Sequence, residues 1–365
     1  MNQRKIRNGL IVCGTLLFGI FLGWSIPIPN PFAGKDEISG NRGAVLYESS
    51  VNYKYINPLL SCDIGTENSF PELVPIKANI STLIDKEIRQ QNATNVSIYL
   101  RSLKGARWFE INGDEQYAPA SLLKVFVMMA YYKADDDTGN GSILGKHLVF
   151  EGSSNPMLDN PGEVIPHLNN GASYSVDMLI NQMIVYSDND AMATLIDGFD
   201  AMTLQDFQNL FSELRVPSPA SQSEDAMNFM PVDSYAMVFR VLFGATYLSR
   251  LYSEKALSML SRVQYVSGIN AGVPTGTIVA HKFGVRSIPA SQNGGTVGAE
   301  LHDCGIVYYP NHPYLLCIMT HGSDFGKLQS VIQDISKATY HQLDIFYGQQ
   351  SSSTSSTVAP IALPH

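Results

Sequence analysis

Ser121 and Lys124 lie three positions apart at the start of the apolar stretch APASLLKVFVMMA, residues 118–130, which predicts a buried helix. Side chains at positions i and i+3 of a helix can meet. A poorly hydrated lysine has a lowered pKa, so its neutral amine can take the proton of a serine hydroxyl. The helix N-terminus adds N–H groups where an oxyanion would form. The pair predicts a serine nucleophile with a lysine base; the alternative is an N-capping serine followed by a snorkelling lysine.

Two further segments carry side chains suited to the same chemistry. Ser187-Asp188-Asn189 falls between two helical patterns, where the serine hydroxyl could pass a proton and the asparagine amide could hold a substrate carbonyl. The other interpretation of this segment is a capped turn between helices. Lys282 and Gly284 lie on a predicted strand, where the lysine could bind an anionic group and the glycine could admit a substrate backbone. A lysine is also common on an edge strand for other reasons.

The three segments together resemble a known family. Ser-x-x-Lys, Ser-Asp-Asn and Lys-Thr-Gly, in this order, mark class A β-lactamases and penicillin-binding proteins. The chain carries the first two motifs complete, and Lys282-Phe283-Gly284 at the third. The resemblance covers nearly all of residues 70 to 345. It implies a serine hydrolase that works through a covalent acyl-enzyme.

The resemblance implies three catalytic residues. Ser121 would be the acylated nucleophile, and Lys124 would be its general base or part of its proton path. Ser187 would pass the proton to the leaving nitrogen. The resemblance requires no metal and no organic cofactor.

The resemblance also implies a substrate-binding set. Asn189 would hold the substrate amide, Lys282 would attract its carboxylate, and Gly284 would let its backbone approach. The backbone N–H groups of Ser121 and Val285 would form an oxyanion hole, in which one donor contributes roughly 3 kcal/mol to the transition state.

The sequence departs from the family pattern in two places. Phe283 replaces the usual Thr or Ser, so a charge-assisted hydrogen bond of about 1.5–3 kcal/mol to the substrate carboxylate is missing. β-Lactamases of this class also have a Glu-x-x-x-Asn loop whose glutamate activates the deacylating water. Glu224 and Asn228 fit that spacing, but Pro231 and a helical pattern follow almost at once, so the loop would be short.

The first functional interpretation is a class A β-lactamase-like hydrolase of β-lactams or related amides and esters, with weak β-lactam turnover. The alternatives are a D-Ala-D-Ala carboxypeptidase or transpeptidase, or a non-catalytic domain that binds cell-wall peptide. The expected partners are a small-molecule β-lactam or a cell-wall peptide, and the expected state is a monomer. A net charge of −9 argues against nucleic acid as a partner.

The N-terminus predicts a membrane anchor. Arg4, Lys5 and Arg7 precede the apolar stretch 9–24, which lacks a clear cleavage site and favours an uncleaved anchor over a signal peptide. The rest of the chain would then be extracytoplasmic, or secreted if the segment is cleaved.

Of the later cysteines, Cys304 and Cys317 could face each other on neighbouring strands or be buried free thiols, and Cys62 would remain alone.

The periodicity along the chain predicts its organisation and fold class. An anchor at 1–24, a spacer at 25–58, a folded domain at 59–348 and a disordered Ser/Thr-rich tail at 349–365 are expected. Within the domain, a helix and a hairpin come first, helical patterns follow to about residue 262, and three strands and a helix come last. One of these helices would begin with the capping box Thr203-x-x-Asp206. The simplest closure is an α+β fold, in which both chain ends build a five-stranded antiparallel sheet, terminal helices cover it, and an all-helical lobe is inserted.

Overall fold

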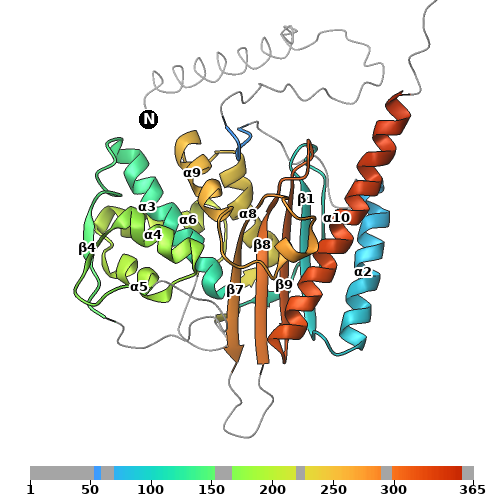
Figure 1. The fold of residues 1–365 in the computed structure, drawn as a ribbon, viewed down its shortest axis with the longest axis horizontal. Coiled ribbons are helices and arrows are strands. Elements are labelled where there is room, and N and C mark those ends of the chain that lie inside the picture. The colour runs from blue at the N-terminus through green and yellow to red at the C-terminus, as the bar shows by residue number, and fades with distance from the viewer. Residues whose placement is uncertain (1–52, 59–69, 153–166, 219–226, 289–297, 356–365) are drawn as a thin grey trace, which may run out of the picture. The chain divides into compact units, whose positions relative to one another are not determined.

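The central sheet takes its strands from both ends of the folded chain (Figure 1). Its order is β2-β1-β9-β8-β7, and every neighbouring pair is antiparallel. The strands are β1 (Asn95–Ser102), β2 (Trp108–Ile111), β7 (Val279–Ile288), β8 (Gly298–Val307) and β9 (Tyr314–Gly322). The predicted sheet is therefore confirmed. The computed structural model describes residues 53–58, 70–152, 167–218, 227–288 and 298–355.

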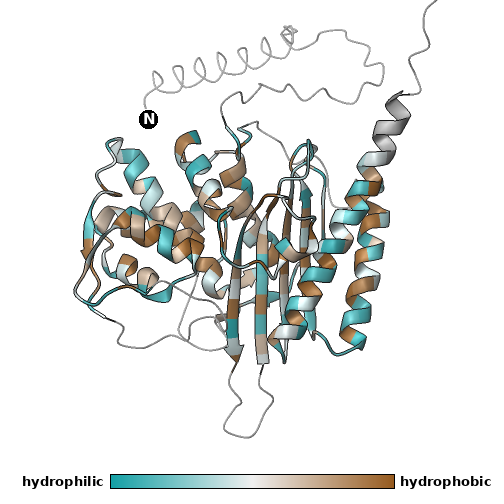
Figure 2. Cartoon of the chain, in the orientation of Figure 1, coloured by the Kyte–Doolittle hydropathy of each residue, from teal (hydrophilic) through white to brown (hydrophobic). Residues whose placement is uncertain are grey.

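Two terminal helices cover one face of this sheet. They are α2 (Val74–Arg89), preceded by the short turn η2 (Pro71–Leu73), and α10 (Phe325–Ser355). They lie side by side in Figure 1, and Figure 2 shows that each carries both hydrophobic and hydrophilic residues. The residues that face inward are fully or almost fully buried at helical spacing: Ile76, Ile80 and Ile84 on α2, and Leu328, Val331, Ile332 and Ile335 on α10. This spacing places one apolar stripe of each helix on the core.

The inserted lobe consists mainly of helices. They are α3 (Lys124–Thr138), which follows the turn η3 (Ala120–Leu123), α4 (Val176–Val185), α5 (Asn189–Asp197), α6 (Ala201–Glu213), α8 (Val232–Phe243) and α9 (Arg250–Leu260). Helix α8 packs on the sheet, against β1, β8 and β9. The turn η4 (Ile269–Gly272) leads back to β7 and contacts α10.

The lobe differs from the prediction in two details. It is not all-helical, because β4 (His147–Val149) pairs with β5 (Ser173–Ser175), and β3 (Gln116–Tyr117) pairs with β6 (Met230–Pro231). These strands are too short to show a periodicity in the sequence. The predicted capping box is also wrong, because Asp200 caps α6 by accepting hydrogen bonds from the backbone N–H and the hydroxyl of Thr203.

The folded part of the chain extends beyond both boundaries expected from the sequence. Residues 53–58, expected in the spacer, pack on the domain, where Ile56 is buried and the Glu254 carboxylate accepts the backbone N–H groups of Lys54, Tyr55 and Ile56. Helix α10 continues to Ser355. Among the described residues, no helix is both long and apolar enough to cross a bilayer. The predicted anchor at 9–24 lies outside the described residues.

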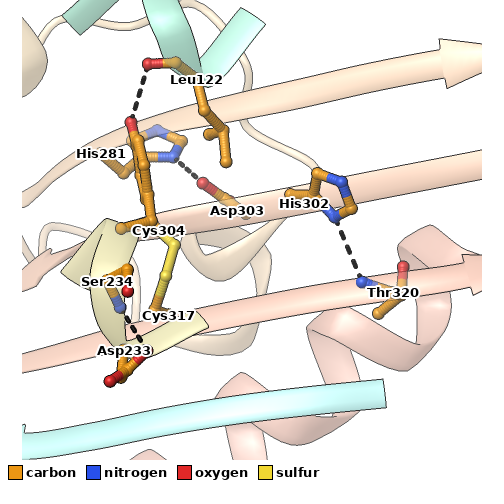
Figure 3. Close-up of a disulfide and its surroundings, with 10 residues drawn as sticks. Leu122, Asp233, Ser234, His281, His302, Asp303, Cys304, Cys317 and Thr320 are labelled. Atoms are coloured by element: carbon orange, nitrogen blue, oxygen red, sulfur yellow. Dashed lines mark hydrogen bonds and ion pairs between the residues drawn. A yellow bond between two sulfur atoms is a disulfide. The ribbon is translucent and has the colours of Figure 1, made fainter. Parts of the chain in front are cut away.

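A disulfide links the adjacent strands β8 and β9 of the central sheet. Cys304 on β8 and Cys317 on β9 are opposite each other in the register, and their sulfur atoms are bonded (Figure 3). Of the two arrangements that the sequence allowed, the structure thus shows the disulfide. Cys62 lies outside the described residues.

Candidate active site

The candidate nucleophile lies in the tight turn η3, immediately before the buried helix α3. Ser121 is half-buried in this turn, and Lys124 is the first residue of α3 and has no exposed surface. Helix α3 is buried on almost all sides because the lobe helices α4, α5, α6 and α9 pack around it. A helix in that position is apolar all round, which explains why the sequence around Lys124 contains so few polar residues.

The Lys124 amine joins the first two motifs. Its Nζ lies 3.1 Å from Ser121 Oγ, 3.2 Å from Ser187 Oγ and 2.8 Å from Asn189 Oδ1, and it also contacts the backbone oxygen of Ser187. Ser187 lies in the α4–α5 connection and Asn189 is the first residue of α5, both more than sixty positions along the chain. Folding therefore brings the four side-chain groups of the first two motifs to one point.

The partners of Lys124 suit a neutral amine. A neutral amine has two N–H groups and one lone pair. The Ser187 carbonyl and the Asn189 amide oxygen can only accept hydrogen bonds, so they take the two N–H groups. The lone pair is then left for the Ser121 or the Ser187 hydroxyl, both within 3.2 Å. The geometry thus allows Lys124 to act as a base.

Burial also favours the neutral form of this amine. Loss of hydration lowers the pKa of Lys124 from its ordinary 10.5 to about 7, against the opposite effect of the Asp188 carboxylate. A substantial share of Lys124 is therefore deprotonated at neutral pH.

Ser187 is held in an unusual backbone conformation between two helices. Its φ is +57°, in the left-handed region that residues with a Cβ rarely adopt. Asp188 caps α5 by accepting the Ala191 N–H at 2.9 Å, and its other oxygen accepts from Gln182 Nε2 at 3.0 Å. These contacts fix the turn, and both the hydroxyl and the carbonyl of Ser187 face Lys124.

Lys282 brings the third motif to the same point. It is fully buried on β7, and its Nζ donates to Ser187 Oγ at 2.9 Å and to the Phe283 carbonyl at 3.0 Å. Ser187 Oγ thus lies between the amines of Lys124 and Lys282. A hydroxyl in that position can receive a proton from one lysine and pass it to a leaving group, while the other lysine stabilises negative charge on it.

Phe283 contributes an aromatic ring at the motif position where the family usually has a hydroxyl. The ring is 1% exposed, and Lys282 Nζ lies 4.1 Å from its centroid. Tyr265, from the segment between α9 and η4, stacks on the ring at 4.2 Å. Where the family has a hydroxyl, this chain therefore has an aromatic pair, Phe283 and Tyr265, packed beside Lys282.

Gly284 has a packing role that the sequence analysis did not include. A Cβ at this position would lie 2.7 Å from the Pro119 carbonyl and 3.0 Å from the Leu122 side chain. Only glycine therefore lets β7 pack this closely on the turn that carries Ser121. Val285 follows on β7 and is half-buried; its oxyanion role stays a prediction.

The second departure falls only partly within the described residues. Glu224 lies outside them, whereas Asn228 is described, and its side-chain oxygen accepts from Arg286 at 2.9 Å.

The sequence did not predict Arg286, Tyr265 and His302, which all lie within or beside the site. No motif marks them, because each is a single residue whose partners are distant in the chain.

Comparison with known proteins gives the family. The model of the β-lactamase enzyme family matches residues 76–343. The chain belongs to the β-lactamase enzyme family. No match was found among curated protein sequences.

Solved structures share this β-lactamase-family fold. PBP-A, also solved as a mutant acyl-enzyme with penicillin G, is 21% identical over 75% of this chain and 97% of its own, with a TM-score of 0.59. The TLA-3 extended-spectrum β-lactamase is 18% identical over 73% and 98%, with a TM-score of 0.61. A β-lactamase from Sphaerobacter thermophilus is 22% identical over 73% and 97%, with a TM-score of 0.59. These similarities show the fold, and the family match places the chain in the β-lactamase enzyme family.

Proposed function

We propose that this β-lactamase-family chain forms an acyl-enzyme on Ser121 with β-lactams or related amides and esters, and that it hydrolyses the adduct slowly. One observation carries the proposal: a buried lysine amine of lowered pKa lies 3.1 Å from the hydroxyl of Ser121. Ser121 and Lys124 together supply the nucleophile and the base that acylation needs. Neither a metal nor an organic cofactor enters the chemistry.

Acylation begins with proton transfer from Ser121 to Lys124. The serine oxygen bonds to the substrate carbonyl carbon, and the proton moves to the lysine amine. The negative charge on the former carbonyl oxygen would be stabilised by the N–H groups of Ser121 and Val285. Ser121 is thus the acylated residue, and Lys124 is the general base.

Ser187 completes the acylation step. When the bond between the carbonyl carbon and the leaving group breaks, the leaving nitrogen or oxygen takes the Ser187 proton. Lys124, now an ammonium 3.2 Å from Ser187 Oγ, returns a proton to that oxygen. Lys282, 2.9 Å from the same atom, stabilises negative charge on it in the meantime. The products are an ester on Ser121 and a neutral amine or alcohol; water must later cleave the ester.

The test of the function is the intact mass of the protein after incubation with penicillin G and with nitrophenyl acetate. We expect one acyl group on the parent protein, on the peptide that contains Ser121, and none on Ser121→Ala. Absence of an adduct with every acyl donor tried would contradict the proposal and favour a domain that only binds cell-wall peptide.

The aromatic residue in the third motif sets a second expectation. Phe283→Thr supplies a hydroxyl next to Lys282, and Phe283→Val has nearly the same shape without it. We expect penicillin G to acylate the threonine variant roughly tenfold to 150-fold faster than the valine variant, because a hydrogen bond to a carboxylate contributes about 1.5–3 kcal/mol. Nitrophenyl acetate, which has no carboxylate, should react equally with both. Equal penicillin rates would show that a hydroxyl at position 283 does not reach the carboxylate. Comparing the two small variants cancels the cavity that each leaves beside Tyr265.

The second candidate function is a D-Ala-D-Ala carboxypeptidase or transpeptidase. It is kept because the PBP-A match spans as much of this chain as the β-lactamase matches do. It uses the same nucleophile, so acylation alone does not separate the two. Release of D-alanine from a pentapeptide, faster than penicillin hydrolysis, would decide for the peptidase.

We also propose that the N-terminal stretch 9–24 anchors the chain in the cytoplasmic membrane with the domain outside. The basic residues before this apolar stretch support that orientation. Full-length protein should sediment with membranes and begin at or near Met1. A soluble mature form that begins after Ser25 would contradict the anchor.

A further inference from the structure

The residue before the nucleophile has a backbone conformation that its own side chain disfavours. Ala120 has a φ of +48°, in the left-handed region, although it carries a Cβ. Such a conformation persists only where the surrounding structure determines it. The contacts that hold this turn therefore also decide where Ser121 points.

Both backbone polar groups of Ala118 are held by side chains of strand β8. His302 Nε2 donates to the Ala118 oxygen at 3.0 Å, and the Ala118 N–H donates to the Glu300 carboxylate. Glu300 and His302 are two positions apart on β8, so they lie on the same face of the sheet. We call these two contacts the β8 clamp.

The protonation state of His302 follows from its partners. Its Nδ1 accepts the backbone N–H of Thr320 at 3.3 Å, a contact that Figure 3 draws, so that nitrogen carries no proton. The Ala118 oxygen can only accept, so Nε2 carries the proton. Burial lowers the pKa of His302 to about 4, which agrees with this neutral form. A fully buried imidazole with both nitrogens engaged gives the clamp one fixed geometry.

Other contacts steady the clamp and the turn. Arg286 lies 3.5 Å from the Glu300 carboxylate and supports it as an ion pair. Gly284 allows β7 to pack on Pro119, and the Tyr235 hydroxyl donates to the Leu122 oxygen at 3.1 Å. These contacts hold the turn that follows Ala118, and the β8 clamp holds the backbone of Ala118 itself.

We propose that Glu300 and His302 are positioning residues, which set the direction of the Ser121 hydroxyl toward Lys124 through the backbone of Ala118. Neither residue is required to touch the substrate. For its kinetic consequence the inference rests on the proposed acylation of Ser121. Its structural consequence, a turn that opens when the clamp is lost, does not depend on any activity.

Two substitutions of His302 separate positioning from packing. Glutamine is long enough to place an N–H near the position of Nε2, so His302→Gln retains the bond to Ala118. Asparagine reaches only the position of Nδ1, so His302→Asn loses that bond while remaining polar. We expect His302→Asn to lower the limiting acylation rate at least tenfold, with the half-saturating concentration changed less than threefold. His302→Gln should stay within threefold of the parent.

A second variant and a control complete the design. Glu300→Gln retains an oxygen for the Ala118 N–H and should acylate within threefold of the parent, whereas Glu300→Leu should lose at least tenfold. Ser336→Ala is the control for destabilisation alone, because Ser336 is buried on α10 and its hydroxyl bonds to Ile269. It should lower the melting temperature without changing the acylation rate.

Hydrogen exchange separates failure of the clamp from failure of the proposed function. Amides of residues 118–123 should exchange at least tenfold faster in His302→Asn than in His302→Gln, whether or not the protein acylates. If the parent protein is never acylated, the proposed function fails and the exchange result alone decides the clamp. Equal exchange rates in the two variants would overturn the inference, as would equal acylation rates in a protein that does acylate.

Discussion

Replacing Lys124 by alanine should lower the rate of Ser121 acylation by about 10²–10⁴, the contribution of a positioned general base. The reason is that the Lys124 amine lies 3.1 Å from the Ser121 hydroxyl, so its lone pair can take the hydroxyl proton. The two residues act as a unit, so Lys124→Ala should be almost as inactive as Ser121→Ala. The measurement is a time course of adduct mass with nitrophenyl acetate and with penicillin G.

Both variants must remain folded for this comparison, which circular dichroism and thermal unfolding can check. The double variant is the matched control, because residues that act as a unit give losses that do not add. Acylation of Lys124→Ala at the parent rate would show that this lysine is not the base.

The pH dependence of acylation follows from the same amine. Because the pKa of Lys124 is lowered to about 7, the rate should rise as the pH increases through about 7 and then level off. Between about pH 7 and 10.5 the unfolded chain holds a proton on Lys124 that the folded chain has lost. This group therefore adds stability as the pH rises across that window, and the gain is lost as the pH falls toward 7. The Lys124→Ala variant should lack this part of the pH dependence.

The adduct on Ser121 should persist far longer than in an efficient β-lactamase. Hydrolysis of the ester needs a base for the incoming water, and a missing or misplaced base slows this step by about 10²–10⁴. Glu224 is the one candidate that the sequence analysis found for this base, in a loop expected to be shorter than that of the family. We expect slow acylation by penicillin G, a long-lived adduct and weak steady-state turnover.

The Glu224→Gln variant decides whether this carboxylate contributes. If the adduct lifetimes of the parent and the variant agree within about threefold, Glu224 is not a working base. Fast multiple turnover in the parent that disappears in Glu224→Gln would contradict the prediction of a persistent adduct. Asp197→Asn, at the exposed last position of α5, is a suitable control for the loss of one carboxylate.

The sequence by itself predicted the architecture of the sheet and the motif residues that the fold brings together. Alternating residues in β1 and the apolar stripe of α10 predicted their elements because burial of one face imposes the period of each structure. The fixed order of Ser121-x-x-Lys124, Ser187-Asp188-Asn189 and Lys282-x-Gly284 predicted which residues would meet. Three short motifs in one order are specific even though each is common alone.

Only the tertiary structure decided how these residues are arranged and what holds them. The lowered pKa of Lys124 depends on complete burial, and two of its partners, Ser187 and Asn189, lie more than sixty positions away. The stacking of Tyr265 on Phe283 and the disulfide between Cys304 and Cys317 arise from neighbouring segments whose register the sequence leaves open. No local sequence pattern predicts the β8 clamp. Glu300 and His302 contact the backbone of Ala118, which only the packing of η3 on the sheet brings within reach. Local periodicity specifies elements, whereas contacts between distant side chains exist only after those elements pack.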